Sequence, residues 1–325
     1  MTDANIFALG TFATVGRPFV GLVIGGLVTS LPEAAAKAGV TLPGPSLPGP
    51  AIVDLLEDWP RYFDTLQTIA AAIRRDGTPG LALNAVHVLP PIPRPSKILN
   101  AAANYSGHLA EMAKYAASGG TAPEAVYKGD KTNSSPYLFF KAPSALTGAF
   151  DPIVLPFEGA EIDWEAELAV VVGARARRVK AARALDHVAG YMTTNDVSCR
   201  SRLFRTDRPN FKTDWMSSKS WDTFAPTGPF FVPRQFVPDY AQLKIRLYVN
   251  GEMRQDGLAG DMIFSPEEQI EHASELMTLE PGDIFCTGTV AGVGQGTGNY
   301  LRAGDVVECE VEGLGRQRNV VAPAA

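Results

Sequence analysis

Acidic residues stand at alternate positions between residues 161 and 167, and this pattern constrains the fold more than any other stretch. The four acids are Glu161, Asp163, Glu165 and Glu167, and the apolar run 168–172 follows them. Alternation is the period of a β-strand, so we expect the four carboxylates on one face of a strand that enters a hydrophobic core. Such a row repels itself and is costly to bury unless a cation compensates it.

A further carboxylate, Asp196, follows a second strand-like segment at residues 189–194. Carboxylates without Cys or His beside them suit a hard, oxygen-seeking ion such as Mg²⁺, Mn²⁺ or Ca²⁺ rather than zinc. The alternative is a solvated edge strand that simply carries four acids, which is the commoner situation in an arbitrary protein. The apolar run argues against this alternative, and we predict a divalent-cation site.

Composition and charge argue against several classes of protein. The chain has 325 residues, of which 29 are basic and 35 acidic, and no basic run stands out, so nucleic-acid binding is not expected. Its three cysteines lie far apart and form no CxxC pair, which indicates neither a disulfide framework nor a zinc site and favours a cytoplasmic protein. The apolar run 19–28 is about half the length of a membrane span. We expect instead a buried strand pair that turns at Gly25 and Gly26.

Helix, strand and proline patterns divide the chain into two parts. Short strands open the chain, and helical patterns follow at 32–39 and 52–73. The proline-rich stretch 88–97 suits neither a helix nor a central strand and marks a boundary. We predict a small N-terminal α/β domain at residues 1–90 and a second domain at 91–325. The second domain shows no βαβ alternation, so we expect it to be mainly β with minor α.

His108 and Glu111 lie three residues apart on an expected helix and therefore share one of its faces. Considered alone, such a pair is more often a surface pair than a catalytic one. The polar, glycine-rich stretch 118–136 follows without any periodicity, and it is either a surface loop or a mobile lid over a site.

Several separated segments are similar to motifs of the fumarylacetoacetate hydrolase family. They are NYSGHLAEM (104–112), FKAPSALTGAFDPIVLP (140–156), IDWEAELAVVVG (162–173), GYMTTNDVSCR (190–200), KSWDTFAPTGPF (219–230), NGEMRQDGLAGDMIF (250–264) and TLEPGDIFCTGTVAGVG (278–294). The resemblance covers about residues 88–320. It implies a β-roll core, a homodimer, and a divalent ion held by three carboxylates.

The resemblance also implies roles for residues of this chain by their position in those motifs. The implied metal ligands are Glu165, Glu167 and Asp196, the catalytic residues are His108, Glu111 and Lys219, and the substrate-binding residues are Lys219 and Thr289. Asp163 and Glu161 match no metal position, so we expect them in a second layer around the metal or at the surface. The sequence departs from the family pattern at Ser201 and Arg202, where Asp and a nearby Gln are usual, and at Val290, where Pro is usual. These departures leave the metal residues intact and bear on the choice of substrate.

The resemblance and the carboxylate cluster together lead to a hypothesis about the reaction. We expect a divalent-metal-dependent hydrolase that cleaves the C–C bond of a β-diketone acid of the acylpyruvate or fumarylpyruvate type, through an enolate that the metal stabilises. The alternative is a lyase or isomerase acting on a 2-oxo acid, such as an oxaloacetate-type decarboxylase, a sugar-acid dehydratase or a hydroxymuconate-type isomerase. The expected partner is a small 2-oxo or β-diketo acid, and neither nucleic acid nor a membrane. Mg²⁺ or Mn²⁺ is the first choice of cofactor, and Ca²⁺ a further one.

Overall fold

The N-terminal part of the molecule is built on a five-stranded sheet. The computed structural model describes residues 6–15, 17–44, 49, 51–121, 131–208 and 210–324. The sheet has the order β4-β3-β2-β1-β5, and its strands are β1 (Ala8–Thr14), β2 (Arg17–Ile24), β3 (Leu27–Ser30), β4 (Leu81–Ala82) and β5 (His87–Leu89). The turn between β2 and β3 falls at Gly25 and Gly26, whose φ angles of 58° and 83° suit glycine, so the predicted strand pair is confirmed.

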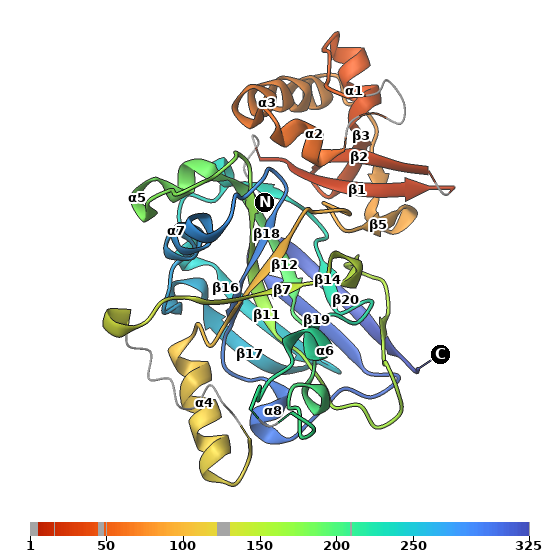
Figure 1. The fold of residues 1–325 in the computed structure, drawn as a ribbon. Coiled ribbons are helices and arrows are strands. Elements are labelled where there is room, and N and C mark those ends of the chain that lie inside the picture. The colour runs from red at the N-terminus through yellow and green to blue at the C-terminus, as the bar shows by residue number, and fades with distance from the viewer. Residues whose placement is uncertain are drawn as a thin grey trace.

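Helices α1 (Leu31–Ala38), α2 (Ile52–Leu56) and α3 (Trp59–Arg75) lie over this sheet (Figure 1). The helical pattern predicted at 52–73 is thus two helices, because Pro60 stands in the first turn of α3 and lacks the N–H that a continuous helix would need. Helix α3 buries one apolar side. Its buried residues include Phe63, Leu66, Ile69, Ala70 and Ile73.

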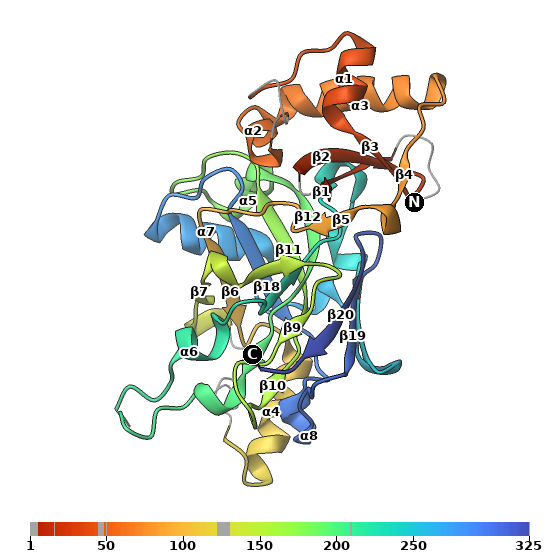
Figure 2. The ribbon, with the colours of Figure 1, turned by 90° about the vertical axis from the view of Figure 1, so that its right-hand side faces the viewer.

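A second sheet, of eight strands, forms the centre of the molecule (Figures 1 and 2). Its main path runs β7-β6-β18-β11-β12-β14-β8, and β15 pairs with β12 beside this path. The strands are β6 (Ile98–Ala102), β7 (Tyr137–Lys141), β8 (Leu146–Gly148), β11 (Ala166–Val172), β12 (Val188–Asn195), β14 (Ala225–Thr227), β15 (Val232–Pro233) and β18 (Ile284–Thr289). Strand β11 is the middle strand and is antiparallel to both of its neighbours, β12 and β18.

A third sheet, of five strands, packs against one face of β11 and β12. It has the order β17-β16-β19-β20-β9, and its strands are β9 (Ile153–Val154), β16 (Lys244–Val249), β17 (Glu252–Leu258), β19 (Val306–Val311) and β20 (Gly315–Ala322). A hairpin turn at Asn250 and Gly251 joins β16 to β17, and both residues have a positive φ. Between the two sheets, Leu168 and Val170 share a buried cluster with Ile245.

Both faces of β11 are buried. The third sheet covers one face, and the N-terminal part of the chain covers the other. Ala169 and Val171 share a second buried cluster with Leu9 and Phe231. The Phe231 ring meets the Trp59 ring edge-on, with centroids 5.4 Å apart. A strand covered on both sides needs consecutive apolar residues, which explains the continuous apolar run of β11.

The remaining elements lie around these sheets. They are helices α4 (Ser106–Ala117), α5 (Ala181–Ala184), α6 (Trp215–Lys219), α7 (Pro266–Leu276) and α8 (Gly294–Thr297), and strands β10 (Ile162–Asp163) and β13 (Ser198–Cys199). Helix α7 begins at a capping box, in which the Glu268 N–H donates to Ser265 Oγ and the Ser265 N–H donates to the Glu268 carboxylate. Helices α4 and α8 lie at the end of the molecule opposite to α1 and α3 (Figures 1 and 2).

The fold is mainly β with minor α, as the sequence predicts. The domain boundary near residue 90 stays a prediction, and the cluster that joins Leu9 to Val171 crosses it. Within the described ranges, no helix is both long and apolar enough to cross a membrane.

The packing of Phe231 gives a test of how the N-terminal part is joined to the central sheet. Phe231 is fully buried, so Phe231→Ala should lower the free energy of unfolding by about 3–5 kcal/mol. Denaturant unfolding followed by circular dichroism measures this loss. The exposed Phe140 is the control, and Phe140→Ala should cost no more than about 0.5 kcal/mol. Equal costs for the two variants would contradict the packing described here.

Candidate metal centre

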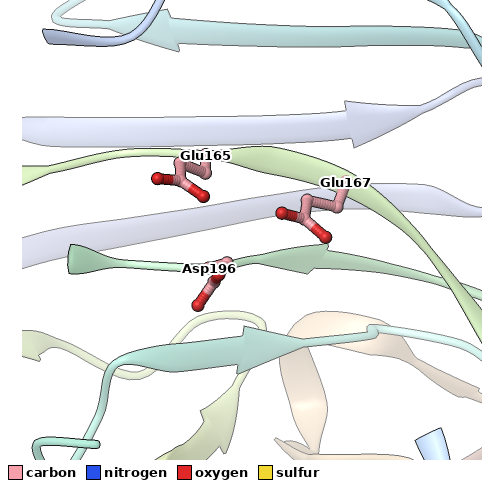
Figure 3. Close-up of side chains that lie close together, drawn as sticks. All are labelled: Glu165, Glu167 and Asp196. Carbon is pink, nitrogen blue, oxygen red and sulfur yellow. The ribbon is translucent and has the colours of Figure 1, made fainter. Parts of the chain in front are cut away.

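Three carboxylates meet at one end of the central sheet (Figure 3). Glu167 belongs to β11, Glu165 stands just before this strand, and Asp196 follows the last residue of β12. The pairing of Asn195 with Ala166 brings the two strand ends together. One oxygen from each carboxylate lies within 4.8 Å of the others, and all three residues are buried. The structure therefore brings the three predicted ligands together.

The prediction that all four alternating acids share one strand face is wrong. The strand is interrupted, because β10 ends at Asp163 and β11 begins three residues later. At the interruption the Glu165 N–H donates to the Asn195 side-chain oxygen at 2.9 Å, outside the regular ladder. Glu161 is exposed, and Asp163 is buried with its carboxylate bound to backbone N–H groups of a later loop.

Two buried lysines supply positive charge to the cluster. Lys219 Nζ donates to Glu165 Oε2 at 2.8 Å and to Asp196 Oδ2 at 2.7 Å. Lys141 Nζ donates to Asp196 Oδ1 and, at 3.0 Å, to the Val197 carbonyl. Lys219 is a predicted site residue, whereas Lys141 is one that the prediction missed. Its signal in the sequence is a lysine at the end of the otherwise apolar and aromatic strand YLFFK.

Burial raises the pKa values of these carboxyl groups, whereas cationic neighbours lower them. Burial alone would raise the pKa of Asp196, but the two lysines outweigh it and lower this pKa to about 2. Burial also opposes ionisation of Glu165, where Lys219 and Arg200 outweigh it and lower the pKa. The pKa of Glu167 is raised well above its ordinary value, because burial and then the charges of Asp196 and Glu165 disfavour its ionised form.

The charge balance and one unpartnered atom indicate that the cluster fits a divalent cation. Four buried carboxylates, those of the triad and of Asp163, face the three buried cationic groups of Lys141, Lys219 and Arg200. Four negative and three positive charges leave one negative charge when all are ionised. Glu167 Oε1 is buried and has no hydrogen-bond partner in the described part of the chain, while Oε2 accepts from the Gly288 N–H. An ion bound to the triad would engage this oxygen, and an all-oxygen donor set suits Mg²⁺, Mn²⁺ or Ca²⁺.

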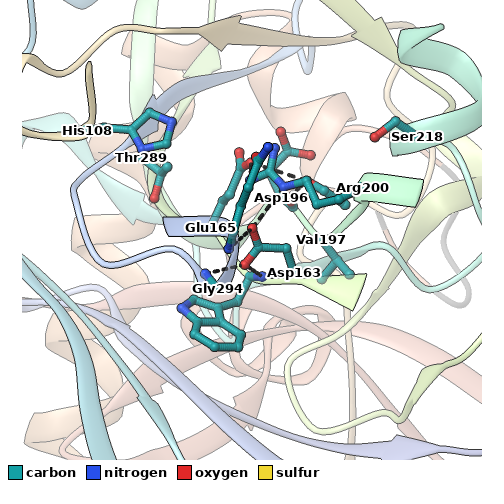
Figure 4. A network of polar contacts seen from close by, with 12 residues as sticks. His108, Asp163, Glu165, Asp196, Val197, Arg200, Ser218, Thr289 and Gly294 are labelled. Carbon is teal, nitrogen blue, oxygen red and sulfur yellow. Dashed lines mark hydrogen bonds and ion pairs between the residues drawn. The ribbon is translucent and has the colours of Figure 1, made fainter. Parts of the chain in front are cut away.

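Asp163 joins the metal cluster to the glycine-rich loop after β18 (Figure 4). Its carboxylate accepts from the N–H of Gly294 at 2.6 Å and from that of the next residue at 3.1 Å, at the start of α8. Arg200 Nε donates to the same carboxylate at 2.8 Å, and a terminal nitrogen of Arg200 donates to Glu165 Oε1 at 2.6 Å. Asp163 thus lies in a second layer around the triad, whereas Glu161 lies at the surface. Arg200 is a further residue that the prediction missed.

The same loop holds the predicted His108–Glu111 pair on α4. His108 Nδ1 lies 3.5 Å from a Glu111 carboxylate oxygen, at the long end of the hydrogen-bond range. The Gly292 N–H lies 3.0 and 3.2 Å from the two Glu111 oxygens and fixes the carboxylate from the other side. A Cβ added at Gly296 would lie 2.5 Å from Glu111 Oε1. A side chain at Gly296 would therefore displace the Glu111 carboxylate.

A pocket of about 610 Å³ leads to the cluster. Three of the predicted catalytic and substrate-binding residues line it, namely His108, Lys219 and Thr289. Glu111 is not among the lining residues. It contacts His108, which does line the pocket. The Thr289 hydroxyl donates to a backbone carbonyl of β11 and accepts from Gln255 Nε2, both at 2.8 Å. Its predicted contact with a substrate oxygen stays a prediction.

The loop or lid predicted at 118–136 lies in large part outside the described residues, because the structure does not describe residues 122–130. At its first end, the Thr121 carbonyl accepts from Gln295 Nε2 at 3.1 Å. At its second end, Lys131 forms an ion pair with Glu268 at 2.7 Å. The role of this segment as a lid stays a prediction.

Comparison with known sequences identifies the family. The model of the family described as Fumarylacetoacetate (FAA) hydrolase C-terminal matches residues 97–322, more than half of the chain. The chain therefore belongs to the fumarylacetoacetate hydrolase family, as its motifs predict. A mitochondrial oxaloacetate tautomerase of Bos taurus is 38% identical over 77% of this chain and 74% of its own length. A mitochondrial oxaloacetate tautomerase of Homo sapiens is 37% identical over 73% of this chain and 70% of its own.

Solved structures share the fold over nearly the whole chain, including the N-terminal sheet. Maleylpyruvate hydrolase from Sphingobium sp. SYK-6, in complex with manganese (II) ion and pyruvate, is 29% identical with a TM-score of 0.72, over 98% of this chain and 100% of its own. The 5-carboxymethyl-2-hydroxymuconate delta-isomerase from Mycobacterium smegmatis is 28% identical with a TM-score of 0.67. The match covers 98% of this chain and 99% of that protein. The manganese complex and the buried triad together indicate a divalent cation.

The raised pKa of Glu167 gives a prediction about stability. In metal-free buffer the folded protein holds a proton on Glu167 that the unfolded chain has already lost, so stability should fall as pH rises above the ordinary carboxyl range. Glu167→Gln should remove this fall and raise the free energy of unfolding at neutral pH, by about 1–3 kcal/mol. Thermal unfolding from pH 4 to 8 in chelator measures the effect. Adding Mn²⁺ should then stabilise the native protein and not Glu167→Gln, and equal stabilisation of both would contradict the assignment.

The network around Asp163 gives a second prediction, with a matched control two residues away. Asp163→Asn removes the charge that holds Arg200 and the start of α8, so it should lower the free energy of unfolding by about 2–4 kcal/mol. Glu161→Gln removes an exposed charge and should stay within about 0.5 kcal/mol of the native protein. Denaturant unfolding compares the two, and a similar small cost for both would show that the network contributes little.

Proposed function

We propose that this chain is a divalent-metal-dependent hydrolase that cleaves the C–C bond of a β-diketone acid of the acylpyruvate or fumarylpyruvate type. One observation carries the proposal: His108, backed by Glu111, lines the same pocket as Glu165 and Lys219. A pocket that combines a cation site with a general base can fix a 2-oxo acid and also activate a water molecule.

The cation site and the residues around it would bind the 2-oxo end of the substrate. Glu165, Glu167 and Asp196 would hold a divalent ion, which would supply Lewis-acid stabilisation of negative charge at the 2-oxo acid end of the substrate. Lys219 adds a positive charge beside these groups, where oxyanion charge develops. Arg200 lines the pocket and holds Glu165 in place through its ion pair.

In this proposal, His108 transfers the protons. Its Nδ1 faces Glu111, which leaves Nε2 to accept a proton from the water that attacks the distal carbonyl. The C–C bond then breaks, its electrons pass to the pyruvoyl part as an enolate, and His108 returns the proton to the carbanion carbon. The Glu111 carboxylate stabilises the imidazolium between the two transfers. The products are pyruvate and a carboxylic acid.

A second candidate is the tautomerisation of oxaloacetate or a related 2-oxo acid. The relatives named oxaloacetate tautomerase, at 37–38% identity, favour it. This reaction needs the same cation site and a base beside the carbon next to the 2-oxo group, but it needs no attacking water and breaks no C–C bond. His108 would remove a proton from that carbon, and the oxygen of the resulting enolate would take up a proton to give the enol.

Product analysis separates the two candidates. Metal-stripped protein is incubated with acetylpyruvate, fumarylpyruvate and oxaloacetate, with and without Mn²⁺, and each reaction is followed by ¹H NMR. The hydrolase predicts pyruvate with acetate or fumarate, and only when metal is present. Enol–keto exchange of oxaloacetate without cleavage of either β-diketone would establish the second candidate, and CO₂ release would establish a decarboxylase.

Replacement of His108 tests its role directly. His108→Ala should lower kcat by at least about a hundredfold, because the positioned base is lost, while Mn²⁺ binding persists because the triad is unchanged. His272→Ala is the control, since His272 lies on α7 outside the pocket. Steady-state kinetics and Mn²⁺ titration check both variants. Full activity of His108→Ala would remove this residue from the mechanism.

A further inference from the structure

One basic side chain of the pocket has no carboxylate of its own. Arg200 and Lys219 line the pocket, and both are bonded to buried carboxylates of the metal centre. Lys212 also lines the pocket but is exposed, so it stands toward the mouth. Its ammonium group makes no hydrogen bond or ion pair with any residue that the structure describes.

The segment that leads into α6 fixes Lys212 and occupies the nearby acids. The Arg205 N–H donates to the Lys212 carbonyl at 3.1 Å, which holds the two sides of the loop together. The Arg205 guanidinium binds Asp207 at 2.6 Å and Asp214 at 2.9 Å. Asp214 also accepts from Ser217 as the cap of α6. Asp207 and Asp214 therefore pair with Arg205 and Ser217, and neither neutralises the positive charge of Lys212.

Aromatic rings connect the metal end of the pocket to the mouth. Lys219 Nζ lies 5.6 Å from the centre of the Phe139 ring, and this ring stacks on Trp215 with centroids 4.7 Å apart. Trp215 follows Lys212 by three residues, and all of these side chains line the pocket. A chain that begins at the metal centre would run along this wall and end beside Lys212.

We propose that Lys212 binds a second carboxylate at the far end of the substrate, so that the enzyme takes a 2-oxo dicarboxylic acid rather than one with an alkyl end. The proposal rests on the proposed function only for the near end of the substrate, which lies at the metal centre. A flat, unsaturated chain would stack on Phe139 and Trp215. The far carboxylate would form a charge-assisted hydrogen bond with Lys212, the lysine that is not bonded to the triad among the described residues of the pocket.

Binding of matched inhibitors tests the proposal without turnover. 2-Oxoadipate and 2-oxohexanoate have the same number of carbons, but only the first ends in a second carboxylate. Isothermal titration of Mn²⁺-loaded native protein should show 2-oxoadipate bound about tenfold more tightly, the effect of one ion-assisted hydrogen bond. Lys212→Gln should abolish this preference and leave 2-oxohexanoate binding unchanged, and Lys212→Arg should restore most of it.

Arg208→Gln is the matched control, because it removes a positive charge from the same loop outside the pocket. It should keep the native preference. A preference that persists in Lys212→Gln, an equal loss for both acids, or no preference in the native protein would each overturn the proposal.

Turnover separates a failure of this proposal from a failure of the proposed function. With fumarylpyruvate, Lys212→Gln should raise KM about tenfold and leave kcat nearly unchanged, because Lys212 would contact only the far carboxylate of the substrate. With acetylpyruvate it should change neither. If no β-diketone is cleaved but the inhibitor preference depends on Lys212, the hydrolase is wrong and the carboxylate subsite stands. Cleavage of both substrates at native KM values by Lys212→Gln would overturn the subsite alone.

Discussion

Mutual repulsion among buried carboxylates is the constraint on which this structure depends. Glu165, Glu167 and Asp196 bring oxygens within 4.8 Å of one another, and all three residues are buried. Two lysines and an arginine compensate part of this charge, and one oxygen of Glu167 has no hydrogen-bond partner among the residues that the structure describes. The fold tolerates an arrangement that costs stability, which is characteristic of a site kept for binding.

The glycine-rich loop after β18 joins the metal centre to the acid–base pair. Its backbone donates to Asp163, which holds Arg200 and through it Glu165. A few residues earlier, the Gly292 N–H donates to Glu111 beside His108. One short segment thus contacts the groups that hold the ligand Glu165 and the proposed base, and a side chain added at Gly296 would displace the Glu111 carboxylate.

Local periodicity predicted the row of carboxylates and several strands, and the family motifs predicted the three metal ligands and the His108–Glu111 pair. They failed where a contact is decided by sheet order, because Lys141 and Asp196 lie 55 residues apart and meet only when β7 and β12 take their places. Strict alternation also failed at Glu161, since the strand is interrupted at residues 164–165. Lys212 carried no signal in the sequence. Its proposed role depends on the ion pairs of Arg205 with Asp207 and Asp214, which only the structure shows.

The central claim is that the triad binds one divalent cation. Crystals of the protein soaked with Mn²⁺, with data collected at the manganese absorption edge, test it most directly. The account predicts one strong anomalous peak per chain, within bonding distance of oxygens from Glu165, Glu167 and Asp196, with Lys219 moved away from at least one of them. No peak at this position, with Lys219 still bonded to both Glu165 and Asp196, would contradict the account.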